Sequence, residues 1–414
     1  MRRSTDVVCL MPVRTVTTET ERFHDGRSTG GRMRKTRSEY ALILAGAAAP
    51  FVGVGLGRFA YNPLFPEMVS AGWLLPAGGG YVGAFNLAGY LSGVMMGRSV
   101  AARAGVPFTI NAAMGLMALS FLASAVNLGL AWLCGARFLA GFSGGVLMVL
   151  AGPVVQSCVS AGRRGIAGGI VISGVGTGII FGAAIMPLLL GFGIVGAWAG
   201  LALITLAIWG LTCHLWPAVS ISAGSGMAVT ARNARLMVVA YGLAGAGMVP
   251  HMVYLSDLFI RGRGYSFGLA STAWLLFGVG AILGSLLGGK AVDRLGGYRA
   301  TLMWLAVQIA GIALLLIWGK QAALAAGFLG GFGGIGLTGV VLGYAHELNP
   351  AISGIIWKAA TAAFAICQAV GSFALAFLFD ISQSHFPVVI AGLLLSAAAF
   401  GLLVIGPRNA PGKS

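Results

Sequence analysis

The sequence has 414 residues, of which 58% are hydrophobic and only 9% are charged. Soluble domains carry about 25% charged residues, so this composition excludes an ordinary soluble protein and indicates a polytopic helical membrane protein. The formal net charge of +16 would suggest a nucleic-acid partner in a soluble protein. Here the basic residues lie in an N-terminal tail and between apolar stretches, where they set membrane topology, so we expect no nucleic-acid partner.

Residues 1–39 are polar and basic and lack the apolar core of a signal peptide, so we expect a disordered cytoplasmic tail. The apolar stretches that follow are each near or above the roughly 20 residues that a membrane-spanning helix needs. We predict twelve spans: 41–67, 77–98, 106–126, 129–152, 165–190, 193–216, 236–258, 267–289, 300–318, 321–345, 351–379 and 386–406.

The first span ends in an unusual run, residues 53–67, which reads GVGLGRFAYNPLFPE. Pro63 and Pro66 have no N–H, so two carbonyls upstream lose their helical partners. Hydrocarbon satisfies neither a bare carbonyl nor the guanidinium of Arg58, and such groups are tolerated where they line a wet cavity. The run therefore predicts the wall of a polar cavity. The alternative is that Arg58 snorkels to the outer surface while the prolines only bend the helix.

The charge distribution between the spans predicts their orientation. With the N-terminus inside, eleven Arg and Lys fall in the inner loops and the C-terminal tail, and three fall in the outer loops. Positive residues concentrate on the cytoplasmic side, so both termini, including the tail 408–414, are predicted to be cytoplasmic. We expect a multi-pass protein of the cytoplasmic (inner) membrane that contacts lipid.

The chain also repeats itself at a spacing of 190 or 191 residues. The pattern GxxxGxxxG over residues 89–97 returns over residues 280–288, and segments of the first and fourth spans return in the seventh and tenth. This predicts an all-α fold of two pseudo-symmetric six-helix halves, 40–216 and 236–407, joined by a short cytoplasmic linker, 217–235. Two repeated halves with a site between them are a plan typical of secondary transporters.

Two motifs resemble those of the major facilitator superfamily. GKAVDRLG over residues 289–296 resembles the superfamily's motif between the second and third spans of a half, and Arg137-Phe-Leu-Ala-Gly141 resembles its fourth-span motif. The first half departs from the loop motif, because Ala102 stands where the aspartate is expected. The resemblance implies the twelve-helix fold of that superfamily.

Other residues resemble the YbfB/YjiJ branch of the superfamily in particular. They are the run from Gly55 to Pro66, the glycines of residues 174–178, and Thr361, Gln368 and Gly371. The resemblance covers about residues 41–406. It implies a permease or efflux protein but names no substrate.

Two arginines are the first candidates for a substrate site. Arg58 lies about 7 Å outward from the centre of its span, and Arg137 also lies slightly outside the midplane of the fourth span. No carboxylate lies deep in any predicted span, so the pair predicts an electropositive patch for an anionic, carboxylate-bearing solute. The alternatives are that Arg137 is structural, bonding nearby carbonyls, and that Arg58 bonds only the carbonyls freed by the prolines.

Four neutral or weakly titratable residues complete the predicted substrate site. Tyr61 and Asn62 belong to the run around Arg58, and His251 is the repeat equivalent of Tyr61. Tyr61 and His251 either face each other across the cavity or pack between helices. Gln368 and Thr361 are two turns apart on one helical face, which fits cavity lining and helix–helix hydrogen bonding equally well.

Four charged residues are candidates for coupling or gating. Glu67 and Asp257 occupy equivalent repeat positions, as outer-gate or proton-carrying carboxylates or as plain interfacial charges. Asp293 and Arg294 belong to the loop motif, where we expect a role in conformational switching; the alternative is an ordinary cytoplasmic turn.

The functional prediction is a secondary active transporter that moves a small organic solute by alternating access, coupled to protons and working as a monomer. Multidrug-type efflux of apolar compounds and a transporter-like sensor without flux remain alternatives. An intramembrane enzyme is disfavoured because no HExxH, paired aspartates or Ser/His set occurs at membrane depth. We expect no catalytic residues, no metal and no cofactor.

Overall fold

The computed structural model describes residues 28–160, 164–219, 232–349 and 352–405, and every regular element in these ranges is helical. The first group of helices is α1 (Ser28–Pro50), η1 (Phe51–Leu56), α2 (Tyr61–Ser70), α3 (Pro76–Ala104), α4 (Val106–Ser124), α5 (Leu130–Cys158), α6 (Arg164–Leu190) and α7 (Gly193–Thr212). The second group is α8 (Arg232–Gly247), η3 (Pro250–Tyr254), α9 (Leu255–Asp257), η4 (Leu258–Gly262), α10 (Phe267–Leu295), α11 (Gly297–Leu314), α12 (Lys320–Gly330), η5 (Gly331–Ile335), α13 (Leu337–Leu348), α14 (Ser353–Ser382) and α15 (His385–Ile405).

Long apolar helices account for all the predicted spans. Within the described ranges, eleven helical segments are long and apolar enough to cross a membrane. The second predicted span is α3, a helix of 29 residues that is not among the eleven, because its glycines and Asn86 lower its mean hydropathy. The all-α membrane fold expected from the sequence is confirmed.

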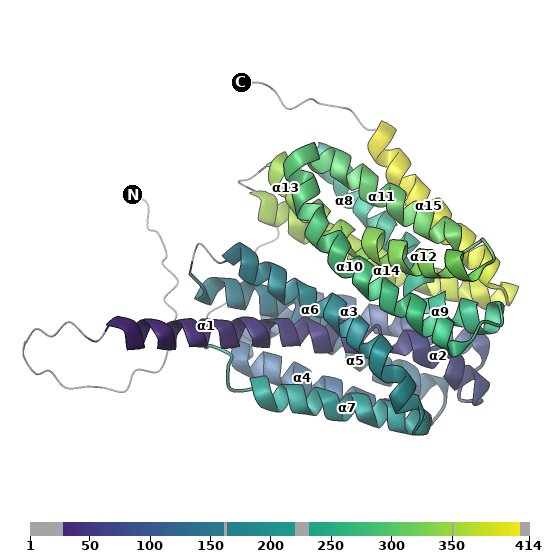
Figure 1. Cartoon of the computed structure of the whole chain (residues 1–414), viewed down its shortest axis with the longest axis horizontal. Helices are drawn as coiled ribbons and strands as arrows, with labels where there is room; N and C mark the ends of the chain where they lie inside the picture. The colour runs from purple at the N-terminus through teal and green to yellow at the C-terminus, as the bar shows by residue number, and fades with distance from the viewer. Residues whose placement is uncertain (1–27, 161–163, 220–231, 350–351, 406–414) are drawn as a thin grey trace, which may run out of the picture.

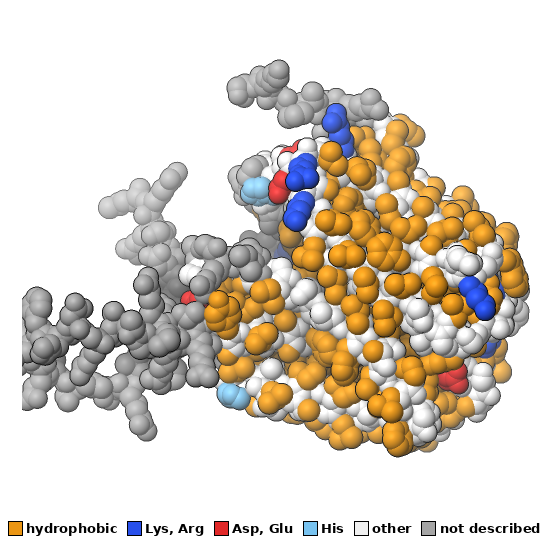
Figure 2. All heavy atoms as spheres, viewed as in Figure 1, with side chains coloured by type: hydrophobic (Ala, Val, Ile, Leu, Met, Phe, Trp, Pro, Cys, Tyr) orange, Lys and Arg blue, Asp and Glu red, His pale blue; other side chains and the backbone are white. Residues whose placement is uncertain are grey.

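The surface has the character of a lipid-facing protein. Hydrophobic side chains cover most of the face seen in Figure 2, and charged side chains appear only toward its edges. A helix that is apolar on all sides is stable where its outer face meets hydrocarbon rather than water.

The two groups of helices lie side by side. Helices α1–α7 form the lower body in Figure 1 and α8–α15 the upper one. The main contacts between the groups are α3 with α14 and α6 with α10. The repeat spacing relates α3 to α10 and α6 to α14, so the two interfaces are equivalent under the repeat.

Glycine stripes set the closest helix contacts, and these contacts repeat as well. In α3, a Cβ on Gly89 would meet the carbonyl of Phe138 on α5. In α10, a Cβ on Gly280 would meet the carbonyl of Phe328 on α12 in the same way. Both members of the contact recur at the spacing seen in the sequence, so the repeat in the chain is also a repeat in the packing.

We call the end of the bundle with the α3–α4 and α10–α11 connections (residues 104–106 and 295–297) the inner end, and the opposite end the outer end. Gly105 and Gly296 make these two turns with φ of 85° and 80°, a backbone conformation that favours glycine.

The boundaries of the predicted tails differ from the structure at one point. Helix α1 begins at Ser28, so it extends into the segment expected to be a disordered tail. No proline lies between residues 28 and 49, so no residue there removes a helical hydrogen bond. Residues 1–27, most of the linker 217–235 and the tail 408–414 lie outside the described residues.

Candidate functional site

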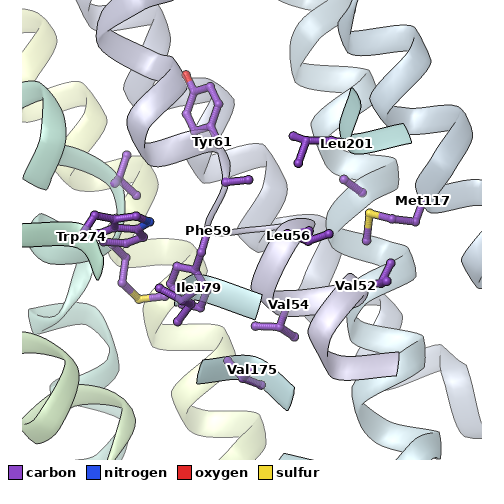
Figure 3. Close-up of a cluster of buried hydrophobic side chains, with 14 of the residues drawn as sticks. Val52, Val54, Leu56, Phe59, Tyr61, Met117, Val175, Ile179, Leu201 and Trp274 are labelled. Carbon is purple, nitrogen blue, oxygen red and sulfur yellow. The ribbon is translucent and has the colours of Figure 1, made fainter. Parts of the chain in front are cut away.

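The first span is broken at the run of glycines and prolines. The α-helix passes into a π-helical turn, η1, and then into an irregular turn over residues 57–60 before α2 begins at Tyr61. Figure 3 shows the side chains around this break, with Phe59 near Trp274 of α10 and Leu56 on the side of Met117 of α4. The rings of Phe59 and Trp274 lie 5.7 Å apart, so the break itself is a contact between the two groups.

Arg58 lies on this break and points toward the second group. Its Nη2 donates a hydrogen bond to Oε1 of Gln368 and another, at 3.6 Å, to the sulfur of Met252. Its guanidinium also lies over the rings of Phe59 and Tyr90, at 5.5 and 5.3 Å from their centroids. The side chain is half-buried, and no carboxylate in the described part of the chain pairs with it. Within the described ranges, Arg58 therefore bonds neither a freed backbone carbonyl nor an acid.

Arg137 has a different environment. It is 1% exposed, and its guanidinium lies beside the stacked rings of Phe121 on α4 and Trp198 on α7, at 5.6 and 5.1 Å from their centroids. Its Nη2 donates a hydrogen bond to the carbonyl of Gly57, in the break. This placement corresponds to the structural alternative: Arg137 holds the broken backbone from inside the first group, while Arg58 points out of it.

Asn62 joins the broken spans of the two groups. Its amide nitrogen donates to the carbonyls of His251 and Met252, at 3.3 and 3.0 Å, and its Oδ1 accepts a 3.0 Å hydrogen bond from the backbone N–H of Ser256. The residue is buried. Asn62 thus satisfies backbone groups in the irregular part of the seventh predicted span, which is the repeat equivalent of the break in the first span. It lies on the outer side of Arg58.

Tyr61 and His251 do not face each other. The Tyr61 hydroxyl donates to the carbonyl of Gly79 within the first group, at 3.0 Å. The Nε2 of His251 lies 3.0 Å from the carbonyl oxygen of Ala326 within the second group. The hypothesis that Tyr61 and His251 face each other across a cavity is therefore replaced by the alternative, in which each side chain packs within its own group.

Gln368 lies on a face of α14 that also carries Trp357, Thr361 and Phe364. Its amide nitrogen donates to the sulfur of Met252 at 2.9 Å and to the carbonyl of Gly245 at 3.4 Å, while its oxygen accepts from Arg58. It therefore both bonds Arg58 and connects α14 to a neighbouring helix. The Thr361 hydroxyl has no hydrogen-bond partner.

An aromatic cluster on this face was not predicted from the sequence. Phe364 stacks on Tyr241 of α8 with 4.6 Å between ring centroids, and Trp357 lies 6.4 Å from the same ring. The Tyr241 hydroxyl is 3.0 Å from Oγ1 of Thr338. The spacing of four, seven and eleven residues along 357–368 is the sequence signal that could have revealed the shared face.

The two carboxylates at equivalent repeat positions have different surroundings. Asp257 is fully buried, and its carboxylate accepts hydrogen bonds from Arg261, one of them at 2.5 Å, and lies 2.7 Å from Nε2 of His385. It is therefore not the plain interfacial charge that was one option for it. Glu67 is half-buried and forms no ion pair with any residue that the structure describes. Arg261 also lies over the ring of Phe65 in the first group, at 5.5 Å.

A cavity of about 590 Å³ opens at the inner end of the second group. It is lined by the ends of α10, α13 and α14: Val292, Asp293, Leu342, Gly343, His346, Glu347, Ser353 and Trp357. Asp293 and Arg294 are exposed at this end, and Glu347 accepts a hydrogen bond from the backbone N–H of Gly297 at the start of α11. Trp357 belongs both to the cavity wall and to the aromatic cluster, so the cavity reaches the face that carries Gln368.

A metal site would need a cluster of side chains that could bind the ion. Over the ranges that the structure covers, no group of three or more His, Cys, Asp or Glu side chains could hold a metal ion.

Comparison with known proteins agrees with this architecture. A family model described as "Uncharacterised MFS-type transporter YbfB" matches residues 50–405. Among solved structures, the chain is similar to a mutant of the nucleoside transporter NupG, with a TM-score of 0.70 over 87% of this chain and 99% of that chain. The two sequences are 12% identical, so this likeness concerns the fold alone. None of the curated proteins compared with the chain matches it in sequence.

Proposed function

We propose that this chain moves a small organic anion across the cytoplasmic membrane by alternating access. The chain belongs to the family described as "Uncharacterised MFS-type transporter YbfB", within the major facilitator superfamily. The observation that carries the proposal is the environment of Arg58. It is a half-buried cation between the two groups of helices, and its hydrogen-bond partners among the described residues, Gln368 and Met252, are neutral.

An uncompensated arginine in a membrane span costs about 2.5–3.5 kcal/mol on insertion scales, so its retention needs a reason. Arg58 does not serve the broken backbone, because Arg137 bonds the carbonyl of Gly57 and Asn62 bonds those of the seventh span. The oxygen that Arg58 does bond belongs to the Gln368 amide. A carboxylate oxygen at the same position would form a stronger, charge-assisted bond. Arg58 is thus suited to bind a solute carboxylate that displaces Gln368.

The distribution of contacts between the groups supports alternating access. Hydrogen bonds between the groups occur at the level of Arg58 and nearer the outer end, as at Asn62 and in the 3.4 Å contact of the Tyr81 hydroxyl with Asp380. The cavity lies at the inner end. We therefore assign this arrangement to the inward-facing state. From the sequence we further propose that both termini are cytoplasmic, that one chain is the transporting unit and that protons are the coupling ion.

The proposal is tested by exchanging Arg58 for lysine, which keeps the charge but loses the planar fork. In purified protein, Arg58→Lys weakens the binding of acetate, succinate, 3-phenylpropionate or 3-cyclohexylpropionate, whichever the wild type binds, by more than tenfold, about 1.4 kcal/mol. Uptake of the bound acid into proteoliposomes falls in parallel. Arg263→Lys is the matched control, because Arg263 lies at the outer end, where it donates to the carbonyls of Leu315 and Ile317.

Two results would contradict the proposal. One is unchanged binding in both Arg58→Lys and Arg58→Ala. The other is a wild type that binds apolar cations and none of the acids, which would favour multidrug-type efflux. Binding of an acid without any flux would favour a sensor.

A further inference from the structure

The wall beside Arg58 is aromatic. Phe364 and Trp357 lie two helical turns apart on one face of α14, and both contact the ring of Tyr241 on α8. Tyr241 is buried, whereas Phe364 and Trp357 each keep part of their surface exposed.

The exposed part of Phe364 is not directed at lipid. The exposed large apolar residues of α14 are Ile366, Val370, Phe377 and Ile381, which follow the opposite side of the helix from Phe364 and Gln368. Trp357 lines the cavity at the inner end. The aromatic wall thus extends from that cavity to the level of Arg58.

The spacing along α14 fits one small molecule. Gln368, which bonds Arg58, lies four residues from Phe364, or about 6 Å along the helix axis. A ring joined to a carboxylate by a spacer of up to two carbons spans such a distance. The rings of Phe364 and Tyr241 are held in place by their mutual stacking and by the contact of the Tyr241 hydroxyl with Thr338.

A cluster of aromatic rings also suits an organic cation, which binds to ring faces. Here the guanidinium of Arg58 lies about one turn away and would repel a cation, and no described carboxylate pairs with that arginine. The combination of rings and one unneutralised arginine therefore favours an aromatic acid.

We infer that the solute is a planar aromatic monocarboxylate, whose ring lies against Phe364 while its carboxylate bonds to Arg58, and that Trp357 supports this site by packing beside Tyr241, the ring on which Phe364 stacks. This inference rests on the proposed function, since it assigns the organic body of the anion that Arg58 binds. Stacking between aromatic rings adds a contribution beyond the burial of apolar area, and an aliphatic ring of the same size lacks it.

The test compares two acids of equal charge and similar length, 3-phenylpropionate and 3-cyclohexylpropionate, with 3-phenylpropylamine as the cationic analogue. Titration calorimetry on the purified full chain is expected to give a Kd for 3-phenylpropionate about two- to tenfold below that for 3-cyclohexylpropionate. Phe364→Leu removes the ring and brings the two values within twofold of each other. Phe377→Leu, on the lipid-facing side of the same helix, leaves the ratio unchanged.

Trp357→Leu is a second variant for the case in which Phe364→Leu does not fold, and a smaller but definite loss of the preference is expected from it. Equal affinity for the two acids, with Arg58 still required, would overturn the aromatic inference and leave the anion proposal standing. Binding of neither ring-bearing acid would overturn the aromatic inference, and the anion proposal would then stand only if acetate or succinate binds in an Arg58-dependent way. Tighter binding of the amine than of any of the acids would overturn both.

Discussion

At the scale of single residues, the two membrane arginines, Arg58 and Arg137, have different surroundings. Arg58 points from the broken span toward Gln368 of the second group, whereas Arg137 is buried beside Phe121 and Trp198 and bonds the carbonyl of Gly57. The polypeptide of the break separates them. The predicted patch of two arginines is therefore better described as one binding candidate and one structural residue that supports it.

This division predicts different outcomes for the same substitution. Arg137→Lys keeps the charge but cannot reproduce the contacts of the guanidinium with Phe121 and Trp198. A lost hydrogen bond from a buried charged group costs about 1.5–3 kcal/mol, so the midpoint of thermal unfolding in detergent should fall clearly. Arg58→Lys, measured beside it, should unfold close to the wild type. A stable Arg137→Lys protein with weakened ligand binding would place Arg137 in the binding site instead.

The buried carboxylate of Asp257 gives a second prediction at this scale. Asp257 bonds Arg261 and contacts His385 within the second group. Arg261 also lies over Phe65 of the first group, so a change in the charge of Asp257 can affect the contact between the groups at the outer end. Asp257→Asn should abolish the stimulation of transport by a proton gradient while substrate exchange across the membrane persists. Glu67→Gln is the matched control, and a larger effect there would reverse the assignment.

At the scale of helices, glycine stripes decide which elements pack. Gly89 and Gly280 let α3 approach α5 and α10 approach α12 until backbone meets backbone. Small residues at such crossings are the usual means of tight helix association in membranes, where apolar side chains gain little by leaving lipid.

The stripe of α10 offers a matched pair of substitutions. Gly280→Ala inserts a methyl group against the carbonyl of Phe328, and overpacking of this kind costs about 1–3 kcal/mol. Gly289→Ala lies on the same helix with open space around the added carbon, and alanine has the higher helix propensity. The unfolding midpoint should fall for Gly280→Ala and stay level or rise for Gly289→Ala. Equal midpoints would show that α10 and α12 separate without cost.

At the scale of the whole molecule, the two groups are joined by two repeat-equivalent interfaces and by bonds at the level of the broken spans and beyond them toward the outer end. If transport requires the groups to rock about a central site, the outer contacts must open in each cycle.

A crosslink can test this requirement. A Cβ on Gly83 of α3 would lie 3.7 Å from the Cβ of Val253 in η3, a separation that suits a disulfide. The double variant Gly83→Cys, Val253→Cys should form a disulfide under mild oxidation and stop transport, and reduction should restore it. Each single variant controls for the substitution itself. Full transport with the disulfide formed would exclude opening at the outer end.

Orientation in the membrane has its own test. A fluorescent protein fused after Ser414 should fluoresce in cells, and a phosphatase that is active only outside the cytoplasm should be inactive at the same position. The opposite pair of results would reverse the topology and place the 590 Å³ cavity on the outside.

The sequence by itself determined the class of the protein, the positions of its twelve long helices, the internal repeat and the break around Arg58. These features depend on local quantities, namely segment length, hydropathy, glycine spacing and proline chemistry, which need no knowledge of neighbours. The residues that the glycine stripes contact recur at the same spacing in the sequence, since Gly89 meets Phe138 and Gly280 meets Phe328.

Only the tertiary structure decided which way each side chain points. Membrane helices are apolar on nearly every face, so the periodicity that separates the inside from the outside of a soluble helix is weak here. The partners of Asp257, the separation of Arg58 from Arg137, and the aromatic wall of Trp357, Phe364 and Tyr241 all depend on rotations of helices about their own axes. Packing against distant helices sets those rotations: His385 is 128 residues from Asp257, and Gln368 is 310 residues from Arg58.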